Sequence, residues 1–327
     1  MFKNLMVYRV GAEWQADVEK IEEALAAGRF VECGATQAQS VGWVPPRGIE
    51  HAPLVEAIDG HLLLKLMVEQ RVLPGSVVKR RVEEMAAAEE AQSGRKPGKK
   101  ALKEMKEFAT QELLPMAFTK QGSIRVWIAP QQRLLMIDAS SPARAEEVVS
   151  LLIKSLDGLS LHLIQTAESP AVCMAAWLMD GQPPHEFTID RDCELKSGDE
   201  MKSVVRYARH ALDIEEVRMH LQSGKAPTKL ALSWRDRVSF VLTDTLQIKK
   251  ISFLDLVFEG KDKPSKDEAF DADMSLSTLE LGELIPALIE GLGGEHDFFG
   301  SAPASTAVDA KPTLSPEPAL EGAAPWD

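Results

Sequence analysis

Two small groups of side chains have types and spacings that could support catalysis. Asp271 and Asp273 are two residues apart in the segment FDAD, and a pair of carboxylates can hold Mg²⁺. A solvated acidic turn is the preferred interpretation, because no third carboxylate or histidine accompanies them. Ser93 and Lys96 have the SxxK spacing of a serine nucleophile and its lysine base. They lie in the basic loop SGRKPGKK, where no helix would fix them, so we interpret this match as chance.

Other motifs for catalysis and cofactor binding are missing from the sequence. None of the Gly-Lys pairs has the surroundings of a phosphate-binding loop, and neither HExxH nor GxSxG occurs. The segment Gly291–Gly294 is interpreted as a helix stop. The histidines are scattered, and Cys33, Cys173 and Cys193 are widely spaced without a CxxC pair. We therefore predict no catalytic residue, no metal site, no cofactor and no structural disulfide, and a reducing cytoplasmic location.

The remaining chemistry is that of clustered positive charge. Residues 79–106 hold nine basic and five acidic residues, and residues 202–237 hold eight basic and four acidic residues. Cations spread along a track suit phosphates, because each contact releases counterions and gives affinity without sequence readout. The alternative is a solvated surface partly neutralised by glutamate. The candidate phosphate contacts are Lys79, Arg80, Arg81, Lys96, Lys99, Lys100, Lys103, Lys106, Arg206, Arg209, Lys225 and Lys229.

The overall charge argues at first against a nucleic-acid partner. The 327 residues include 37 Lys and Arg against 50 Asp and Glu, a formal net charge of −13. Residues 254–327 hold 4 basic and 16 acidic residues, so the preceding 253 residues are close to neutral. The acidity of the last quarter therefore does not exclude a basic binding surface earlier in the chain. The longest apolar run, Val172–Met179, is far shorter than the ~20 residues of a membrane span, so no membrane partner is expected.

The patterning predicts an α+β protein with mixed or antiparallel sheets and a protruding helical tip. Residues 74–123 form the tip, because Pro74-Gly75-Ser76 begins one helix and a second helix over Ala101–Leu114 is stopped by Pro115. Residues 1–73 and 124–180 form a central α+β domain, in which Ile124–Ala129 and Cys173–Met179 are expected strands. Residues 181–297 form a strand-rich base domain with a C-terminal helix. Residues 298–327 are expected to be a disordered, acidic, Ala/Pro-rich tail.

Seven segments resemble, in the same order, blocks of the bacterial recombination-associated RdgC family. They run from the N-terminus to about residue 297 and are FKNLMVYR, GWVPP, LPGSVVK, LLPMAF, TKLALSW, FDAD and LIEGLGGE. The resemblance implies horseshoe-shaped subunits that meet tip-to-tip and base-to-base in a ring-shaped homodimer. It also implies nonspecific binding of single- and double-stranded DNA in the hole of the ring. The resemblance further implies that such binding restrains RecA-dependent recombination at the nucleoid, without a cofactor or turnover.

The resemblance assigns roles to three further positions. Phe118 aligns with the aromatic residue of the family's LLPxAF block, which implies a contact or gate where the tips meet. A buried aromatic at a helix end is the alternative. Arg209 and His210 stand where the family has a Lys-Gln pair, at a base interface or DNA contact. Here histidine, which can change its charge near neutral pH, replaces an amide, so we expect the contact to be weakly pH-sensitive at most.

These features support a DNA-encircling protein that is not an enzyme. One alternative is a metal-dependent enzyme that processes DNA with Asp271 and Asp273. Another is a scaffold that binds the recombinase directly. The tail could also compete with DNA or dock on a partner, although an inert extension is the preferred interpretation.

Overall fold

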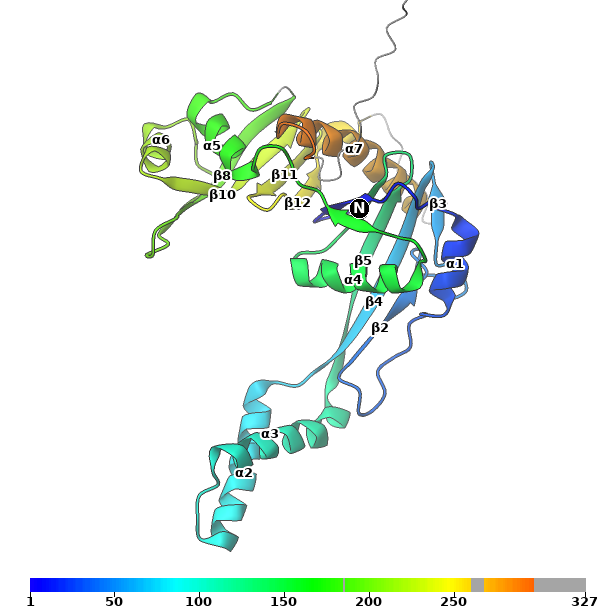
Figure 1. The fold of residues 1–327 in the computed structure, drawn as a ribbon, viewed down its shortest axis with the longest axis vertical. Coiled ribbons are helices and arrows are strands. Elements are labelled where there is room, and N and C mark those ends of the chain that lie inside the picture. Colours follow the sequence, from blue (N-terminus) through cyan, green and yellow to red (C-terminus); the bar gives the residue numbers. More distant parts are fainter. Residues whose placement is uncertain (185, 260–267, 297–327) are drawn as a thin grey trace, which may run out of the picture. The chain divides into compact units, whose positions relative to one another are not determined.

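Two antiparallel sheets organise the protein, and Figure 1 shows their arrangement in the computed structural model. The structure describes residues 1–184, 186–259 and 268–296, so the predicted tail at 298–327 lies outside the described residues. The α+β class with antiparallel sheets is confirmed. Within the described residues the helices are α1 (Val18–Ala26), α2 (Gly75–Ser93), α3 (Lys99–Leu113), α4 (Pro142–Ser155), α5 (Pro170–Asp180), α6 (Glu215–Gln222) and α7 (Ala269–Gly291), with 3₁₀ turns η1 (Leu114–Met116) and η2 (Asp255–Val257).

The first sheet has seven strands in the order β2-β4-β5-β6-β1-β7, with β3 paired to β4. Its strands are β1 (Met6–Val10), β2 (Gln39–Val44), β3 (Glu56–Ile58), β4 (His61–Val72), β5 (Phe118–Ala129), β6 (Leu134–Ile137) and β7 (Leu161–Leu163). Successive residues of these strands point to opposite faces of the sheet. Leu64, Leu66 and Val126 pack with Ile21 of α1 and Val148 of α4, so these two helices cover one face of the sheet.

The second sheet has five strands in the order β12-β11-β10-β8-β9. Its strands are β8 (Phe187–Ser197), β9 (Val204–Tyr207), β10 (Lys225–Trp234), β11 (Val238–Thr243) and β12 (Ile248–Phe253). Leu63 and Trp127 from the other face of the first sheet share a core with Leu232 of β10 and Leu284 of α7. Leu5, just before β1, and Ile248 of β12 exchange backbone hydrogen bonds of 2.7 and 3.0 Å, and this antiparallel bridge links the two sheets.

Helix α7 contains a proline, and a side chain from another element replaces the backbone hydrogen bond that this proline removes. Pro286 cannot donate a backbone hydrogen bond, so the carbonyl of Gly282 loses its usual intrahelical partner. The side-chain amide of Gln132 donates to that carbonyl at 3.0 Å. Ser277 and Thr278 lie inside α7, and their hydroxyls donate to the carbonyls of Asp273 and Met274, one turn earlier.

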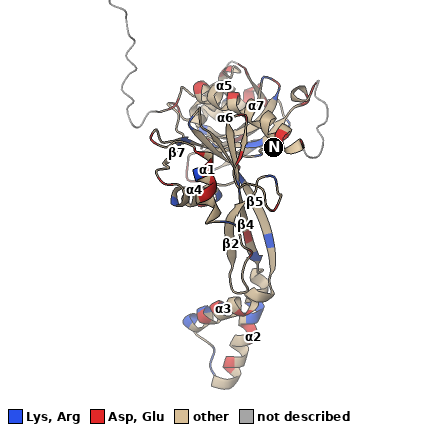
Figure 2. Cartoon of the chain, turned by 90° about the vertical axis from the view of Figure 1, so that its right-hand side faces the viewer, with Lys and Arg blue, Asp and Glu red and all other residues tan. Residues whose placement is uncertain are grey.

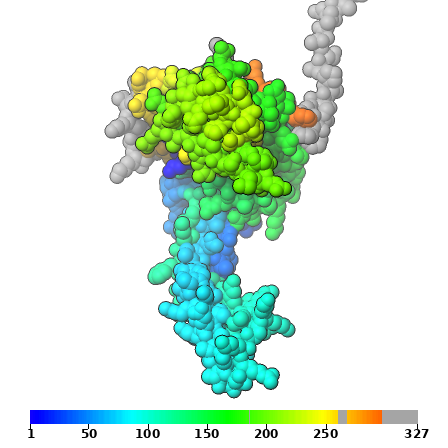
Figure 3. All heavy atoms as spheres, turned by 90° about the vertical axis from the view of Figure 1, so that its left-hand side faces the viewer, coloured from blue at the N-terminus to red at the C-terminus, as the bar shows by residue number. Residues whose placement is uncertain are grey.

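Strands β4 and β5 are joined at their outer ends by the two tip helices. The strands pair without a break from Leu62–Ile128 to Val72–Phe118, so the ribbon extends past the helix-covered part of the sheet. In α2 and α3 the only fully buried side chains among the described residues are Val78, Met105 and Ala109. The tip helices, cyan in Figure 3, therefore expose most of their side chains.

Two sequence-based expectations about elements are wrong. Residues 173–179 form part of α5 instead of a strand. The Ser169 hydroxyl accepts from the Val172 N–H, Pro170 occupies the first turn, and Gly181 ends the helix in the left-handed conformation. These are ordinary helix boundary signals that the continuous apolar run obscured. Strand β5 also starts six residues earlier than expected, at Phe118.

Candidate nucleic-acid interface

The tip cations are exposed and only weakly paired. Along α2 and α3 several of them lie 3.7–4.0 Å from a glutamate one turn later, with side chains 77–93% exposed; these are Lys79, Arg80, Lys100 and Lys103. A basic residue placed N-terminal to its acidic partner is the weaker orientation of such a pair, and exposed pairs contribute little. Lys96, Lys99 and Lys106 are exposed and form no ion pair within the described residues. Figure 2 shows these charges along both helices.

The start of α3 concentrates positive charge. Gly98 precedes the helix without a side-chain cap, and the first turn contains Lys99 and Lys100 but no acidic residue. Because the N-terminal end of a helix is itself positive, these lysines oppose the helix dipole. An anion bound there would relieve that repulsion.

Arg81 differs from the other tip cations. Its Nε and Nη2 donate to both carboxylate oxygens of Glu112 at 3.0 and 2.9 Å, and Nη1 donates to Glu84 at 3.2 Å. The hydrogen bonds to Glu112, with those to Glu84, raise the pKa of Arg81. Arg81 therefore links α2 to α3, and a phosphate would have to displace a carboxylate to reach it.

Two candidate cations of the predicted base domain donate hydrogen bonds to the same carboxylate. Glu194 of β8 lies between Arg206 of β9 and Lys229 of β10 in the strand register, and its oxygens accept from them at 2.6 and 3.0 Å. Burial opposes ionisation of Glu194, but bonds from Lys229, Arg206 and Thr228 outweigh it and lower its pKa to about 2. This cluster keeps a net positive charge at the sheet surface.

The other candidate phosphate contacts of the predicted base domain lie near the end of β9 and around α6. Arg209 adopts a left-handed backbone with φ of 54°, and its N–H donates to Asp192 at 2.7 Å. The His210 ring lies 6.0 Å from the Tyr207 ring, and both Arg209 and His210 are exposed. Lys225 Nζ lies 3.2 Å from His220 Nδ1.

Phe118 is 86% exposed at the first position of β5, directly opposite Val72. The buried-aromatic alternative is therefore wrong. Met116 is 71% exposed two residues earlier, and Val72 is also exposed. Apolar groups left in water at a strand end form a surface suited to burial against another molecule.

Arg71 fixes the position of the tip where it joins the first sheet, a role that the sequence does not predict. Its guanidinium donates to the carbonyl oxygens of Leu114, Pro115 and Ala117 at 3.0–3.4 Å. It also donates to those of Cys33 and Gly34 at 3.2–3.4 Å. One side chain of β4 thus ties the end of α3 and η1 to the loop before β2. A lone arginine in a strand gives no sequence signal for this role.

The carboxylates proposed for metal chemistry are engaged elsewhere. Asp271 accepts two hydrogen bonds from Arg47 at 2.6 and 3.0 Å, which raise the pKa of that arginine. Asp273 lies 4.0 Å from the N-terminal amine of Met1. Among the described residues, no group of three His, Cys, Asp or Glu is placed to hold a metal ion. Ser93 is the last residue of α2, so its predicted place in the loop is wrong, and its hydroxyl donates to the Glu89 carbonyl at 2.8 Å.

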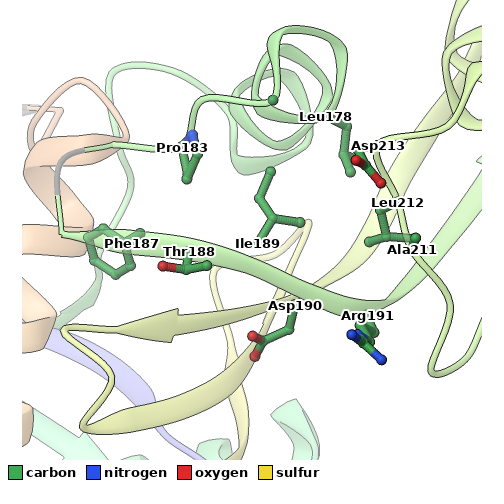
Figure 4. Close-up of a pocket in the computed structure, with 11 residues that line it drawn as sticks. Leu178, Pro183, Phe187, Thr188, Ile189, Asp190, Arg191, Ala211, Leu212 and Asp213 are labelled. Atoms are coloured by element: carbon green, nitrogen blue, oxygen red, sulfur yellow. The ribbon is translucent and has the colours of Figure 1, made fainter.

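A cavity of about 410 Å³ lies between α5, β8 and the segment before α6 (Figure 4). Leu178, Ile189 and Leu212 give it an apolar interior, and Asp213 lies at its edge. Asp190 points to the other side of β8, where its carboxylate accepts from Ser233 at 2.9 and 3.1 Å. Burial raises the pKa of Asp190. The two carboxylates do not converge, so this cavity does not form an acid–base pair.

The thiols and helices add little chemistry of their own. All three cysteines are free, and burial raises the pKa of Cys193 to about 12 and that of Cys173 to about 11. Among the described helices, none has the length and apolar character needed to cross a membrane.

Comparison with known proteins covers nearly the full chain. Residues 1–295 match a family model described as "Putative exonuclease, RdgC". The chain belongs to the RdgC family. It is 48% identical over 299 residues to the recombination-associated protein RdgC of Dechloromonas aromatica (strain RCB), a match that covers 90% of this chain and 98% of the relative. The RdgC proteins of Herminiimonas arsenicoxydans and Bordetella pertussis (strain Tohama I / ATCC BAA-589 / NCTC 13251) are 44% and 42% identical, again over 90% of this chain and 98% of each relative.

Membership of the RdgC family confirms the resemblance drawn from the seven sequence blocks and associates the chain with recombination. The family model's description names an exonuclease, whereas the relatives are named for recombination. These names leave open whether the chain has an enzymatic activity.

Proposed function

We propose that this protein binds single- and double-stranded DNA without sequence preference and restrains RecA-dependent recombination by occupying the DNA. The observation that carries the proposal is the series of exposed, weakly paired cations along both tip helices. A phosphate can replace each glutamate at little cost, because the existing pairs are solvated. The many small contacts then sum to affinity through counterion release.

The binding unit in this proposal is a ring-shaped homodimer. Phe118, Met116 and Val72 supply the apolar surface by which the tips of two copies meet. Arg209 and His210 serve the second contact or touch DNA at the base. DNA inside the closed ring is held by topology as well as by charge. The protein acts at the nucleoid in the cytoplasm, and neither a cofactor nor nucleotide turnover is needed for occlusion.

The family model's description favours one other function, cleavage of DNA ends. Asp271 and Asp273 are the candidate ligands for Mg²⁺ in that case. Their present pairing with Arg47 and the N-terminal amine counts against it, because a metal would have to displace both partners. A scaffold that binds RecA directly is a further alternative, and inhibition that persists with saturating competitor DNA would favour it.

The topological part of the proposal is tested on circular and linear DNA of the same sequence. The protein is loaded at low salt, and the salt concentration is then raised to remove complexes held by charge alone. We expect retention on covalently closed circles and loss from linear DNA with open ends. Equal loss from both would contradict encirclement. End-labelled linear DNA with Mg²⁺ reports cleavage in parallel, and shortening abolished by Asp271→Ala and Asp273→Ala would support the nuclease instead.

A further inference from the structure

A small polar cleft lies where the β4–β5 ribbon leaves the cover of α4. It has a volume of about 220 Å³ and is separate from both tip helices. Its lining comes from β4, β5 and the first two turns of α4, and consists of Val68, Gln70, Lys120, Gln121, Gly122, Ile124, Arg144 and Glu147. The cleft is smaller than the ~300–1,000 Å³ of ordinary small-molecule sites, so it suits a single phosphate group better than a whole nucleotide.

The strand register explains why this place is hollow. Lys120 pairs with Gln70, and Gly122 pairs with Val68, so all four belong to the sheet face on which Ile124 packs with α4. Gly122 has no side chain, and a Cβ built there would meet nothing within 4 Å. The gap left by this glycine is the floor of the cleft.

The charged side chains that line the cleft have a net positive charge that one anion would balance. Lys120 and Arg144 are exposed, and neither forms an ion pair within the described part of the chain. The one acid in the lining, Glu147, accepts a hydrogen bond from the Gln39 amide at 2.7 Å. Two cations and one carboxylate give a net charge of about +1, which a single phosphodiester would balance. Arg144 also stands in the first turn of α4, which contains no acidic residue to offset the positive helix end.

We propose that this cleft holds one phosphodiester of a bound DNA strand, with Lys120 and Arg144 as its direct contacts. The inference rests on the proposed DNA binding and adds to it a fixed phosphate site outside the dense basic zones. The tip cations can exchange along the backbone, whereas a walled cleft fixes one phosphate at the root of the ribbon. The cleft would therefore set the position of the strand relative to the first sheet.

The test measures DNA affinity over a series of salt concentrations for variants of the full chain. Lys120→Ala and Arg144→Ala each remove one cation, and Gly122→Val fills the floor without altering charge. Each is expected to weaken binding about 5- to 10-fold and to reduce the slope of log affinity against log salt by about 1. Lys154→Ala, which removes an exposed lysine from the last turn of α4, is the matched control and should bind like the wild type.

The possible outcomes separate this site from the general function. Wild-type affinity in Lys120→Ala, Arg144→Ala and Gly122→Val would overturn the cleft while leaving DNA binding intact. No DNA binding by the wild type would overturn the proposed function itself. Titration with inorganic phosphate distinguishes the source of the anion. Loss of phosphate binding in the variants with unchanged DNA affinity would make the cleft a free-anion site and overturn the DNA assignment. Circular dichroism spectra that match the wild type establish that each variant is folded.

Discussion

Replacing Arg71 with alanine is expected to loosen the root of the tip and to weaken DNA binding. Five carbonyl oxygens lose the Arg71 donor at once, and they belong to two segments that no other described side chain joins in this way. The carbonyls of Leu114 and Gly34 keep a backbone N–H donor, so the loss falls mainly on those of Cys33, Pro115 and Ala117. Unsatisfied acceptors in a half-buried site cost about 1–3 kcal/mol, so we expect unfolding free energy to fall by about 2 kcal/mol. Amide hydrogens of α2, α3 and η1 should exchange faster, because these elements lose their anchor.

Matched variants separate this anchoring role from simple loss of charge. Arg71→Lys keeps the charge but cannot direct several donors at fixed angles, so it should restore only part of the stability. Arg95→Ala removes an exposed arginine near the outer end of α2 and should leave both stability and exchange unchanged. Wild-type exchange rates throughout the tip of Arg71→Ala would show that the guanidinium does not hold it.

Replacing Phe118 with alanine is expected to weaken the proposed homodimer without weakening the fold. The side chain is 86% exposed in the single chain, so its removal should change the unfolding free energy by less than about 0.5 kcal/mol. An aromatic residue central to an interface contributes about 2 kcal/mol or more, which corresponds to a rise of about 30-fold in the dimer dissociation constant. Sedimentation equilibrium measures the dimer, and urea unfolding measures the fold.

Leu279→Ala is the control for the Phe118 experiment, since Leu279 is 58% exposed on α7. It should leave the dimer unchanged. A Phe118→Ala protein that dimerises like the wild type would remove the tip contact from the account. A large loss of stability would instead mean that Phe118 is buried within its own subunit in solution.

The sequence predicts those parts of the fold that local signals specify. The hairpin of tip helices follows from Pro74, Pro115 and the basic loop between them, and the antiparallel class follows from the alternating strands. The α5 segment was misassigned because its eight apolar residues fit a buried strand as well as a buried helix. The capping signals at Ser169 and Gly181 would have decided between them.

Other features of the fold have tertiary causes. Strand β5 begins at Phe118 because it pairs with β4 beyond the core, where its own residues 118–123 are exposed and no apolar alternation marks a strand. Pro286 is tolerated because Gln132, more than 150 residues earlier in the sequence, supplies the missing donor. The roles of Arg71, Lys120 and Arg144 depend likewise on distant segments. By contrast, the exposure of the tip cations and of Phe118 was predictable from their polar surroundings.

The negative net charge of the chain does not describe the charge that DNA would meet at the tip. The tip cations are partly compensated by glutamates on the same helices, so total charge says little about what a phosphate would meet there. The ease with which a phosphate displaces each paired carboxylate determines whether the cation can contact DNA. Exposed pairs one turn apart exchange readily, whereas the Arg81–Glu112 pair between helices does not.

The most direct test of DNA binding by the tip is the salt dependence of affinity for duplexes of unrelated sequence. The wild type is compared with a variant in which Lys79, Lys100, Lys103 and Lys106 are all alanine. We predict a steep linear fall of log affinity with log salt, equal for all sequences, and a slope smaller by about 3 to 4 in the variant. A flat salt response in the wild type, binding confined to one sequence, or an unchanged slope in the variant would contradict the account.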